Sequence, residues 1–300
     1  MPAESGLANA RTSSLARNLG VTVQKSSSTA SAAPRSHPSR RTAWWRSGWF
    51  DSVVFALLML GLGWLTVSGA QSMGYNWQWY RVPQYLYRVI DDELIWGPLL
   101  RGVWVTLQIT LYSTVLTLLI GLLTTLLRMS NSVAGHALAT IYLELIRNTP
   151  LLVQMFVFYF VLAPIFGIDR FWVGVLCLSF FEGSFAAEII RAGILGVARG
   201  QWEASSSIGL GRLQTYRYIV LPQAVPLMLP PLTSLVINLI KNSAIVSVIA
   251  VFDLTTEGRN IIADTFMSFE IWLTVAAMYL VLTVTLSVLV GLLEKRVQAR

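Results

Sequence analysis

Long apolar segments constrain the fold of this chain more than any other feature of its sequence. Six of them approach the roughly 20 residues that a helix needs to cross a bilayer. They run from about Ser52 to Val67, Val103 to Leu127, Leu143 to Phe166, Phe171 to Leu195, Val225 to Phe252 and Ile271 to Leu293. Membrane strands would instead alternate apolar and polar residues over about ten positions, and the chain shows no such alternation. The sequence therefore predicts an all-α, polytopic membrane protein with about six transmembrane helices.

The composition excludes several other classes of protein. Of the 300 residues, 55% are hydrophobic and 12% are charged, whereas about a quarter are charged in a typical soluble domain. A net charge of +7 would suggest nucleic acid as a partner of a soluble protein. Here it reflects Lys and Arg gathered at the cytoplasmic face, so no nucleic acid is expected. The single cysteine, Cys177, excludes an intrachain disulfide, and the two His residues lack a Cys or carboxylate cluster, so no metal site is predicted.

The chain divides into three parts by composition. Residues 1–46 are rich in Ser, Ala and Arg and cannot bury a core, so we expect a disordered, basic cytoplasmic tail. No apolar region follows its first charges, which excludes a signal peptide. The tail either orients the chain in the membrane or has a regulatory role. Residues 47–98 hold the first transmembrane helix and an aromatic extracytoplasmic segment, and residues 99–295 form the core transmembrane domain.

Basic residues predict the orientation of the spans. With the N-terminus inside, most of the 22 Lys and Arg fall on one face, and the positive-inside rule then places both termini in the cytoplasm. The stretch between the fourth and fifth spans lies on the same side. On the outer side, "GYNWQWYRVPQYLYR" (Gly74 to Arg88) is rich in Trp and Tyr. These rings predict an interfacial anchor, and a docking surface for an extracytoplasmic partner is the alternative.

One cytoplasmic stretch, "GQWEASSSIGLGRLQTYRYIVLP" (residues 200–222), is polar and punctuated by glycine. Residues 202–208 favour a short helix, because Glu203 near its start complements the positive end of the helix dipole. Gly209 and Gly211 permit the positive φ that ends a helix. A second short helix, residues 212–219, leads to Pro222, which suits the first turn of the next span.

The first of these short helices is thin. Ala204 and the three serines that follow it let another protein's backbone approach closely. A helix that lies on lipid needs a large apolar face, and this one offers only Trp202 and Ile208 as bulky apolar residues. We therefore expect a protein-docking element at the cytoplasmic face.

The residues of this stretch resemble the EAA loop of bacterial ABC importer permeases. The matching positions are Glu203, Ala204, Ser205, Gly209, Ile219, Val220, Leu221 and Pro222. Ser205 replaces the usual alanine and is nearly as small. Three further stretches resemble the polar amino acid branch of the histidine/glutamine/glutamate type: "YLELIRNTPLLVQMFVFYF" (142–160), "AAEIIRAGILGVARGQWEA" (186–204) and "LPPLTSLVINLIKNSAIVSVIAVFDL" (229–254). The resemblance covers roughly residues 75–295.

The resemblance implies a type I ABC importer permease fold in the bacterial inner membrane and transport of a polar L-amino acid. The partners that it implies are ABC ATPase subunits, a second permease subunit that is identical or paralogous, and an extracytoplasmic amino acid-binding protein. Membrane lipid is a further expected partner. The coupling residues would be Glu203, Ala204, Ser205, Gly209, Ile219, Leu221 and Pro222. No G-x-x-x-x-G-K-[ST] phosphate loop occurs, so the chain is not expected to be an enzyme or to hold a cofactor. ATP and magnesium would be bound by the partner ATPase.

Two Glu-apolar-Ile-Arg patterns lie near the cytoplasmic ends of the third and fourth spans. They are Glu144/Arg147 and Glu188/Arg191, each spaced i, i+3, so that both partners share one helix face. We expect ion pairs that stabilise the helix ends or a cytoplasmic gate.

Glu182 lies near the bilayer midplane, where ionisable residues are functional candidates. It either lines the substrate pathway and meets an ammonium group, or forms a structural pair with Lys241. Lys241 and Asn242 belong to "KNSA", which interrupts the fifth span. Because a broken helix exposes backbone polar groups, such a break is expected beside a cavity or inside protein. Lys241 and Asn242 are therefore further pathway candidates. The depth of Lys241 in the membrane depends on whether the span begins at Pro222 or at Pro231.

Two other classes of function compete with the importer. A secondary transporter or channel would show inverted repeats or carboxylates for ion coupling, and no repeat is found. A membrane enzyme would need clustered catalytic residues, but His37 and His136 lack obvious partners.

Overall fold

The computed structural model describes residues 48–90 and 92–298 and falls into two units, residues 1–75 and 76–300. The predicted tail, residues 1–46, lies outside the described residues. In the first unit the described residues are the helix α2 (Gly48–Ser72) and the three residues that follow it, and α2 confirms the first predicted span. The unit boundary follows Tyr75, whereas the sequence division between residues 98 and 99 stays a prediction.

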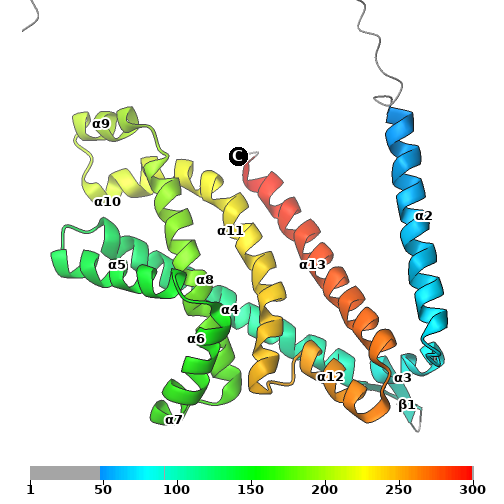
Figure 1. The fold of residues 1–300 in the computed structure, drawn as a ribbon. Helices are drawn as coiled ribbons and strands as arrows, with labels where there is room; N and C mark the ends of the chain where they lie inside the picture. The colour runs from blue at the N-terminus through cyan, green and yellow to red at the C-terminus, as the bar shows by residue number, and fades with distance from the viewer. Residues whose placement is uncertain (1–47, 91, 299–300) are drawn as a thin grey trace, which may run out of the picture. The chain divides into compact units, whose positions relative to one another are not determined.

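The second unit is helical apart from a two-stranded hairpin. Its elements are η2 (Trp79–Arg81), α3 (Pro83–Leu86), β1 (Tyr87–Ile90), β2 (Glu93–Trp96), α4 (Pro98–Met129), α5 (Val133–Arg147), α6 (Leu151–Val157), η3 (Phe158–Leu162), α7 (Ala163–Phe166), α8 (Arg170–Leu195), α9 (Arg199–Ser207), α10 (Arg212–Thr215), η4 (Tyr216–Val220), α11 (Leu221–Ser243), η5 (Ala244–Ile249), α12 (Leu254–Thr265) and α13 (Ser268–Gln298). Strands β1 and β2 pair antiparallel, with Tyr87 opposite Trp96. In Figure 1, α9 and the end of α13 lie at one end of this unit, and α12 and β1 lie at the other.

The number of spans agrees with the sequence prediction. Among the described residues, five helices are long and apolar enough to cross a membrane. A sixth crossing is added when α5 and the α6–α7 stretch count as one bent span. The predicted all-α, polytopic fold class is therefore confirmed.

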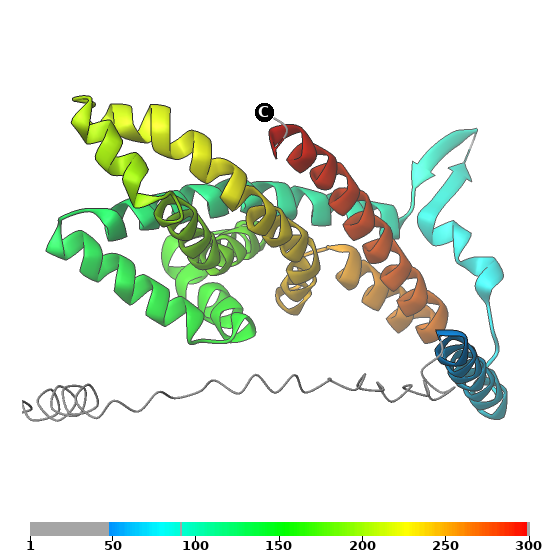
Figure 2. The ribbon, with the colours of Figure 1, turned by 90° about the horizontal axis from the view of Figure 1, so that it is seen from above.

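Close packing of α4 against α8 forms the centre of the second unit, and Figure 2 shows α4 running across the unit beside the other spans. One face of α4 carries small residues that are buried, at positions 106, 110, 113, 117, 121 and 124. Their spacing of three and four residues keeps them on one helix face. Thr125 of α4 also donates a hydrogen bond from its Oγ1 to the carbonyl of Ala187 at 2.9 Å. Small residues let the two backbones approach, and this approach positions the carboxylates of α8.

Gly121 lies where α4 and α8 approach each other closely. A Cβ added there would lie 2.7 Å from the Cβ of Ala186, so Gly121→Val is expected to force α4 and α8 apart. Overpacking of this kind costs about 1–3 kcal/mol, which should lower the midpoint of thermal aggregation in detergent. Gly291→Val is the matched control, because no atom lies within 4 Å of a Cβ at that position of α13. Equal midpoints for the two variants would contradict the packing argument.

The third predicted span, Leu143 to Phe166, was wrong as one straight helix. Helix α5 ends at Arg147, and the chain bends by 109° before Leu151. Pro150 precedes α6 and disfavours helical geometry in the residue before it. Buried Gln154 holds the bend, since its Nε2 donates to the carbonyls of Ile146 at 2.7 Å and Thr149 at 3.0 Å.

The fifth predicted span, Val225 to Phe252, also has different bounds. The helical stretch begins at Arg212, so neither Pro222 nor Pro231 starts it. Residues 216–220 form a π-turn in which the Leu221 N–H donates to the Tyr216 carbonyl. This wider turn carries the helix past Pro222, which has no N–H to donate. The expected separate helix over 212–219 and rigid proline entry are therefore replaced by a continuous stretch, and α11 changes to a 3₁₀ helix after Ser243 within "KNSA".

Helix α12 was absent from the sequence prediction. Buried Asp253 begins it by accepting the backbone N–H groups of Thr255 and Thr256, and the Tyr279 hydroxyl of α13 donates to the same carboxylate at 3.2 Å. Burial raises the pKa of Asp253, while these hydrogen bonds oppose the rise. The short polar sequence of α12 gives no apolar signal of spanning length, so hydropathy alone could not find it.

The aromatic segment after residue 76 packs on the start of α13. Trp77 stacks on Trp79 with ring centroids 6.3 Å apart and lies 5.7 Å from the ring of Phe269. The Gln78 backbone N–H donates to Glu270 Oε1 at 2.6 Å. Tyr80 remains 80% exposed. The structure thus anchors this segment to protein, and its predicted interfacial or docking role stays a prediction.

Candidate functional site

The loop between α8 and α11 begins with the short helix and the turn that its sequence predicts. Helix α9 (Arg199–Ser207) is followed by Gly209, whose φ of 80° reverses the chain, and by the short helix α10. Gly211 has an ordinary negative φ of −68°, so the expected positive φ was wrong there. It serves as the N-cap of α10, and its N–H donates to Gln214 Oε1 at 3.0 Å. In Figure 1 this loop projects from one end of the second unit.

Three internal contacts hold the loop in shape. The buried Ser205 hydroxyl accepts from Thr215 Oγ1 at 3.2 Å and donates to the Trp202 carbonyl at 2.8 Å. The Trp202 ring meets the edge of Tyr216 with centroids 5.3 Å apart. Ser205 therefore faces α10 instead of the outer surface of α9. A small side chain is required there because two helices approach each other, a reason that the sequence did not supply.

The outer surface of α9 is made of small or polar side chains. Glu203, Ala204 and Ser207 are exposed, and Glu203 pairs with exposed Arg199 at 3.1 Å. Further along, Leu221 and Pro222 are exposed and Ile219 is half-buried. Apart from half-buried Trp202, which contacts Tyr216, α9 carries no bulky apolar side chain. Such a surface can enter the groove of another protein.

A second candidate site surrounds Glu182 in α8. Glu182 is 4% exposed, and its carboxylate accepts a hydrogen bond from Asn242 Nδ2 at 2.7 Å. The alternative of an ion pair with Lys241 was wrong, because Lys241 is exposed and the two side chains form no ion pair in the structure. Adjacent helix positions point in different directions, so α11 presents Asn242 to α8 and turns Lys241 away.

The Glu182 carboxylate lines a pocket of about 320 Å³ between α8 and α11. Phe181 and Phe185 supply apolar walls, while Ser234, Asn238 and Asn242 add polar groups. Sequence reasoning missed Ser234 and Asn238. Their spacing of four residues from each other and from Asn242 places all three on one face of α11, so helical periodicity could have found them.

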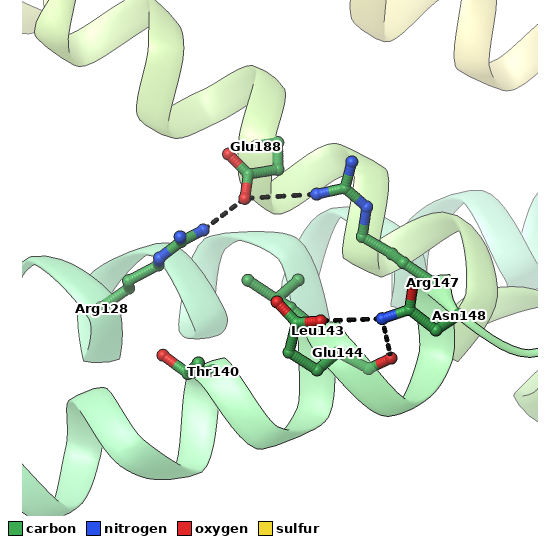
Figure 3. A pocket seen from close by; sticks show the side chains of 7 residues that line it. All are labelled: Arg128, Thr140, Leu143, Glu144, Arg147, Asn148 and Glu188. Atoms are coloured by element: carbon green, nitrogen blue, oxygen red, sulfur yellow. Dashed lines mark hydrogen bonds and ion pairs between the residues drawn. The ribbon is translucent and has the colours of Figure 1, made fainter.

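A third cluster joins α4, α5 and α8 (Figure 3). Glu188 forms ion pairs with Arg128 and with Arg147, the latter at 3.4 Å. The expected i, i+3 pairs were wrong: Glu144 accepts from the Asn148 amide at 2.7 Å, and Arg191 forms no ion pair with a described residue. Arg128, which sequence reasoning did not single out, lines a pocket of about 340 Å³ with these groups.

Glu188 pairs with arginines of other helices, and not with Arg191 of its own helix, because the helices cross at this point. Figure 3 shows Arg128 and Arg147 approaching Glu188 from two separate helices. An exposed i, i+3 ion pair stabilises a helix by only a few tenths of a kcal/mol. The half-buried Glu188 carboxylate instead lies between two guanidinium groups, and its ion pairs connect three helices. Glu188 is thus the common partner that ties α4 and α5 to α8.

Fold and loop together define a multi-span helical membrane protein with a structured loop exposed at one end. A family model described as "Binding-protein-dependent transport system inner membrane component" matches residues 118–299. The chain belongs to this family, which confirms the resemblance of its sequence to ABC importer permeases. It is therefore a membrane-spanning permease component of such an importer in the bacterial inner membrane, and the alternatives of a secondary transporter or a membrane enzyme are set aside.

Several relatives agree with this assignment. The chain is 37% identical over 214 residues to the "Glutamine transport system permease protein GlnP" of Escherichia coli (strain K12), covering 69% of this chain and 98% of that protein. It is 44% identical over 163 residues to the "Probable glutamine ABC transporter permease protein GlnM" of Bacillus subtilis (strain 168), covering 54% and 75%. The solved structure "Crystal structure of an amino acid ABC transporter with histidines" shares 39% identity with a TM-score of 0.62, covering 66% of this chain and 94% of that one. A structure of the MetNI methionine ABC transporter, at 21% identity, a TM-score of 0.59 and coverage of 67% and 96%, shares the fold.

Proposed function

We propose that this chain is the permease subunit of an ATP-driven importer that carries a polar L-amino acid into the bacterial cytoplasm. The names of the relatives support the substrate class, since they denote glutamine and amino acid transport. The observation that carries the proposal is the α9–α10 loop, in which a narrow helix with exposed Glu203 and Ala204 projects at one end of the permease.

In this proposal the loop lies in the cytoplasm with both termini and inserts α9 into a groove of an ABC ATPase subunit. That subunit binds ATP and magnesium, so this chain needs no cofactor of its own. A second permease subunit, identical or paralogous, completes the pathway, and an extracytoplasmic binding protein delivers the amino acid. Closure of two ATPase subunits moves the paired loops, and the spans then alternate access around a midplane site.

The Glu182 pocket is the proposed path of the substrate. A buried carboxylate in a membrane span is costly unless a partner compensates it. Asn242 supplies one neutral hydrogen bond, and the amide and hydroxyl groups of Asn238 and Ser234 share the same pocket. An amino acid brings an ammonium group for the carboxylate and polar groups for the amides. Glu182 and Asn242 therefore serve as substrate contacts, and exposed Lys241 has no part in this pocket.

A crosslinking experiment tests the docking of the ATPase. The chain's single cysteine, buried Cys177, is replaced by Ser, and Ala204→Cys is introduced on the exposed face of α9. A bifunctional thiol-to-amine reagent in intact cells is expected to join the permease to its ATPase. Val89→Cys, on the exposed hairpin at the other end of the unit, is the control and should give no such product. Capture from position 89 in place of 204 would reverse the proposed orientation, and capture from neither position would contradict the docking role.

A further inference from the structure

The α9–α10 loop borders a pocket that is separate from the Glu182 pocket and that includes one of the coupling residues, Leu221. It has a volume of about 750 Å³ and lies between the last turns of α4, the end of α8 and the residues from Trp202 to Leu221. We call it the loop pocket. It separates the loop from the end of α4, so whatever fills it touches both.

Apolar side chains make up much of the loop pocket. Leu122 and Leu126 come from α4, and Leu213 comes from α10. All three are exposed, Leu213 by 82%. Leucines on the outer face of a membrane span normally contact acyl chains, and Leu122 and Leu126 continue that surface into the pocket. An exposed leucine in a polar loop is different, because water would surround it unless an apolar occupant covered it.

The polar part of the loop pocket is positively charged. Arg212 lines it and forms no ion pair with any residue that the structure describes. Ser206 and Asn131 add neutral polar groups, and no carboxylate is among the lining residues. A free guanidinium beside hydroxyl and amide groups is suited to bind the oxygens of a phosphate.

The position of the loop pocket along the spans suits both its apolar part and its positively charged part. Helix α4 ends at Met129 and α8 ends at Leu195, so the pocket lies beside the ends of two helices that are long and apolar enough to span a membrane. Trp202 and Tyr216, whose rings contact each other, also line it. Trp and Tyr settle at the headgroup level of bilayers. Acyl chains are therefore on one side of the pocket and phosphate groups on the other.

We propose that the loop pocket binds an anionic phospholipid, with its acyl chain against Leu122, Leu126 and Leu213 and its phosphate on Arg212. The bound lipid joins the end of α4 to the α9–α10 loop and sets the position of the loop. Membrane composition would then regulate the element that this chain offers to its ATPase. The site itself depends only on the membrane location of the family and not on the proposed substrate or docking role.

Native mass spectrometry of the full-length permease in detergent tests this site, with phosphatidylglycerol and phosphatidylcholine as probes. The wild-type chain is expected to retain phosphatidylglycerol in preference. One arginine near the membrane surface changes the affinity for an anionic lipid by on the order of fivefold. Arg212→Gln should therefore lower the affinity for phosphatidylglycerol by roughly that factor. Arg217→Gln is the matched control, since Arg217 lies over the ring of Tyr218 and does not line the pocket. Leu126→Trp, which fills the apolar part, should weaken both lipids.

Three results would overturn the proposal. In the first, the wild-type protein retains the two lipids equally. In the second, Arg212→Gln and Arg217→Gln lower the affinity for phosphatidylglycerol to the same extent, which would indicate general charge attraction. The third result concerns the occupant in the assembled transporter. A photoreactive amino acid in place of Leu213 is expected to label lipid in intact membranes, and labelling of an ATPase or a second permease in its place would show that protein covers the pocket.

Discussion

Glu182→Gln is expected to remove substrate-stimulated ATP hydrolysis at amino acid concentrations that stimulate the wild-type transporter. Glutamine has nearly the same shape and keeps an oxygen to accept the Asn242 amide, which lies 2.7 Å from the carboxylate. The substitution therefore removes the charge and leaves the packing of α8 on α11. A hydrogen bond to a charged group contributes about 1.5–3 kcal/mol, so the half-stimulating concentration should rise by about tenfold to a hundredfold.

The chain offers a close control for this experiment. Glu144 also accepts an amide hydrogen bond at 2.7 Å, from Asn148, but it is exposed and lies outside the Glu182 pocket. Glu144→Gln makes the same chemical change and should leave the stimulation curve in place. The measurement is ATPase activity of the reconstituted transporter against amino acid concentration. Unchanged stimulation and transport in Glu182→Gln would remove Glu182 from the pathway.

Gly209→Val should uncouple the permease from its ATPase while the spans still fold. The φ of 80° at this turn costs an L-residue roughly 1–2 kcal/mol, and a β-branched side chain is least suited to it. The chain then leaves the turn, and the hydrogen bond between Ser205 and Thr215 that holds α9 on α10 is lost. We expect the ATPase to copurify poorly and amino acid uptake to fall by about fivefold to thirtyfold.

Gly209→Asn separates the backbone effect from a steric one. Asparagine tolerates the left-handed conformation, and a Cβ at position 209 meets no atom within 4 Å. This variant should keep most of the copurification and uptake. Loss of both functions in the Asn variant as well would mean that the added side chain obstructs docking. Normal coupling in the Val variant would mean that the turn has no mechanical role.

The outcome for these two sites shows how far local sequence goes. Position 209 was identified correctly, because a glycine after a short polar helix is a local signal that depends on a single φ angle. The partner of Glu182 was not identified: Lys241 and Asn242 are adjacent in sequence, and only the rotation of α11 decides which of them faces α8. The same holds for Glu188, whose partners Arg128 and Arg147 come from two other helices.

The sequence by itself determined the class of this protein, since the hydropathy of a span and the spacing of the loop residues are properties of continuous segments. It also determined where the loop turns, since Gly209 acts within a few residues of itself. Tertiary structure alone decided the 109° bend that Gln154 holds, the helix α12 and the partners of the buried carboxylates. The physical reason is distance along the chain. Asn242 lies 60 residues from Glu182, and Arg128 lies 60 residues from Glu188, so these contacts depend on how each helix is rotated and crossed, which no local pattern records.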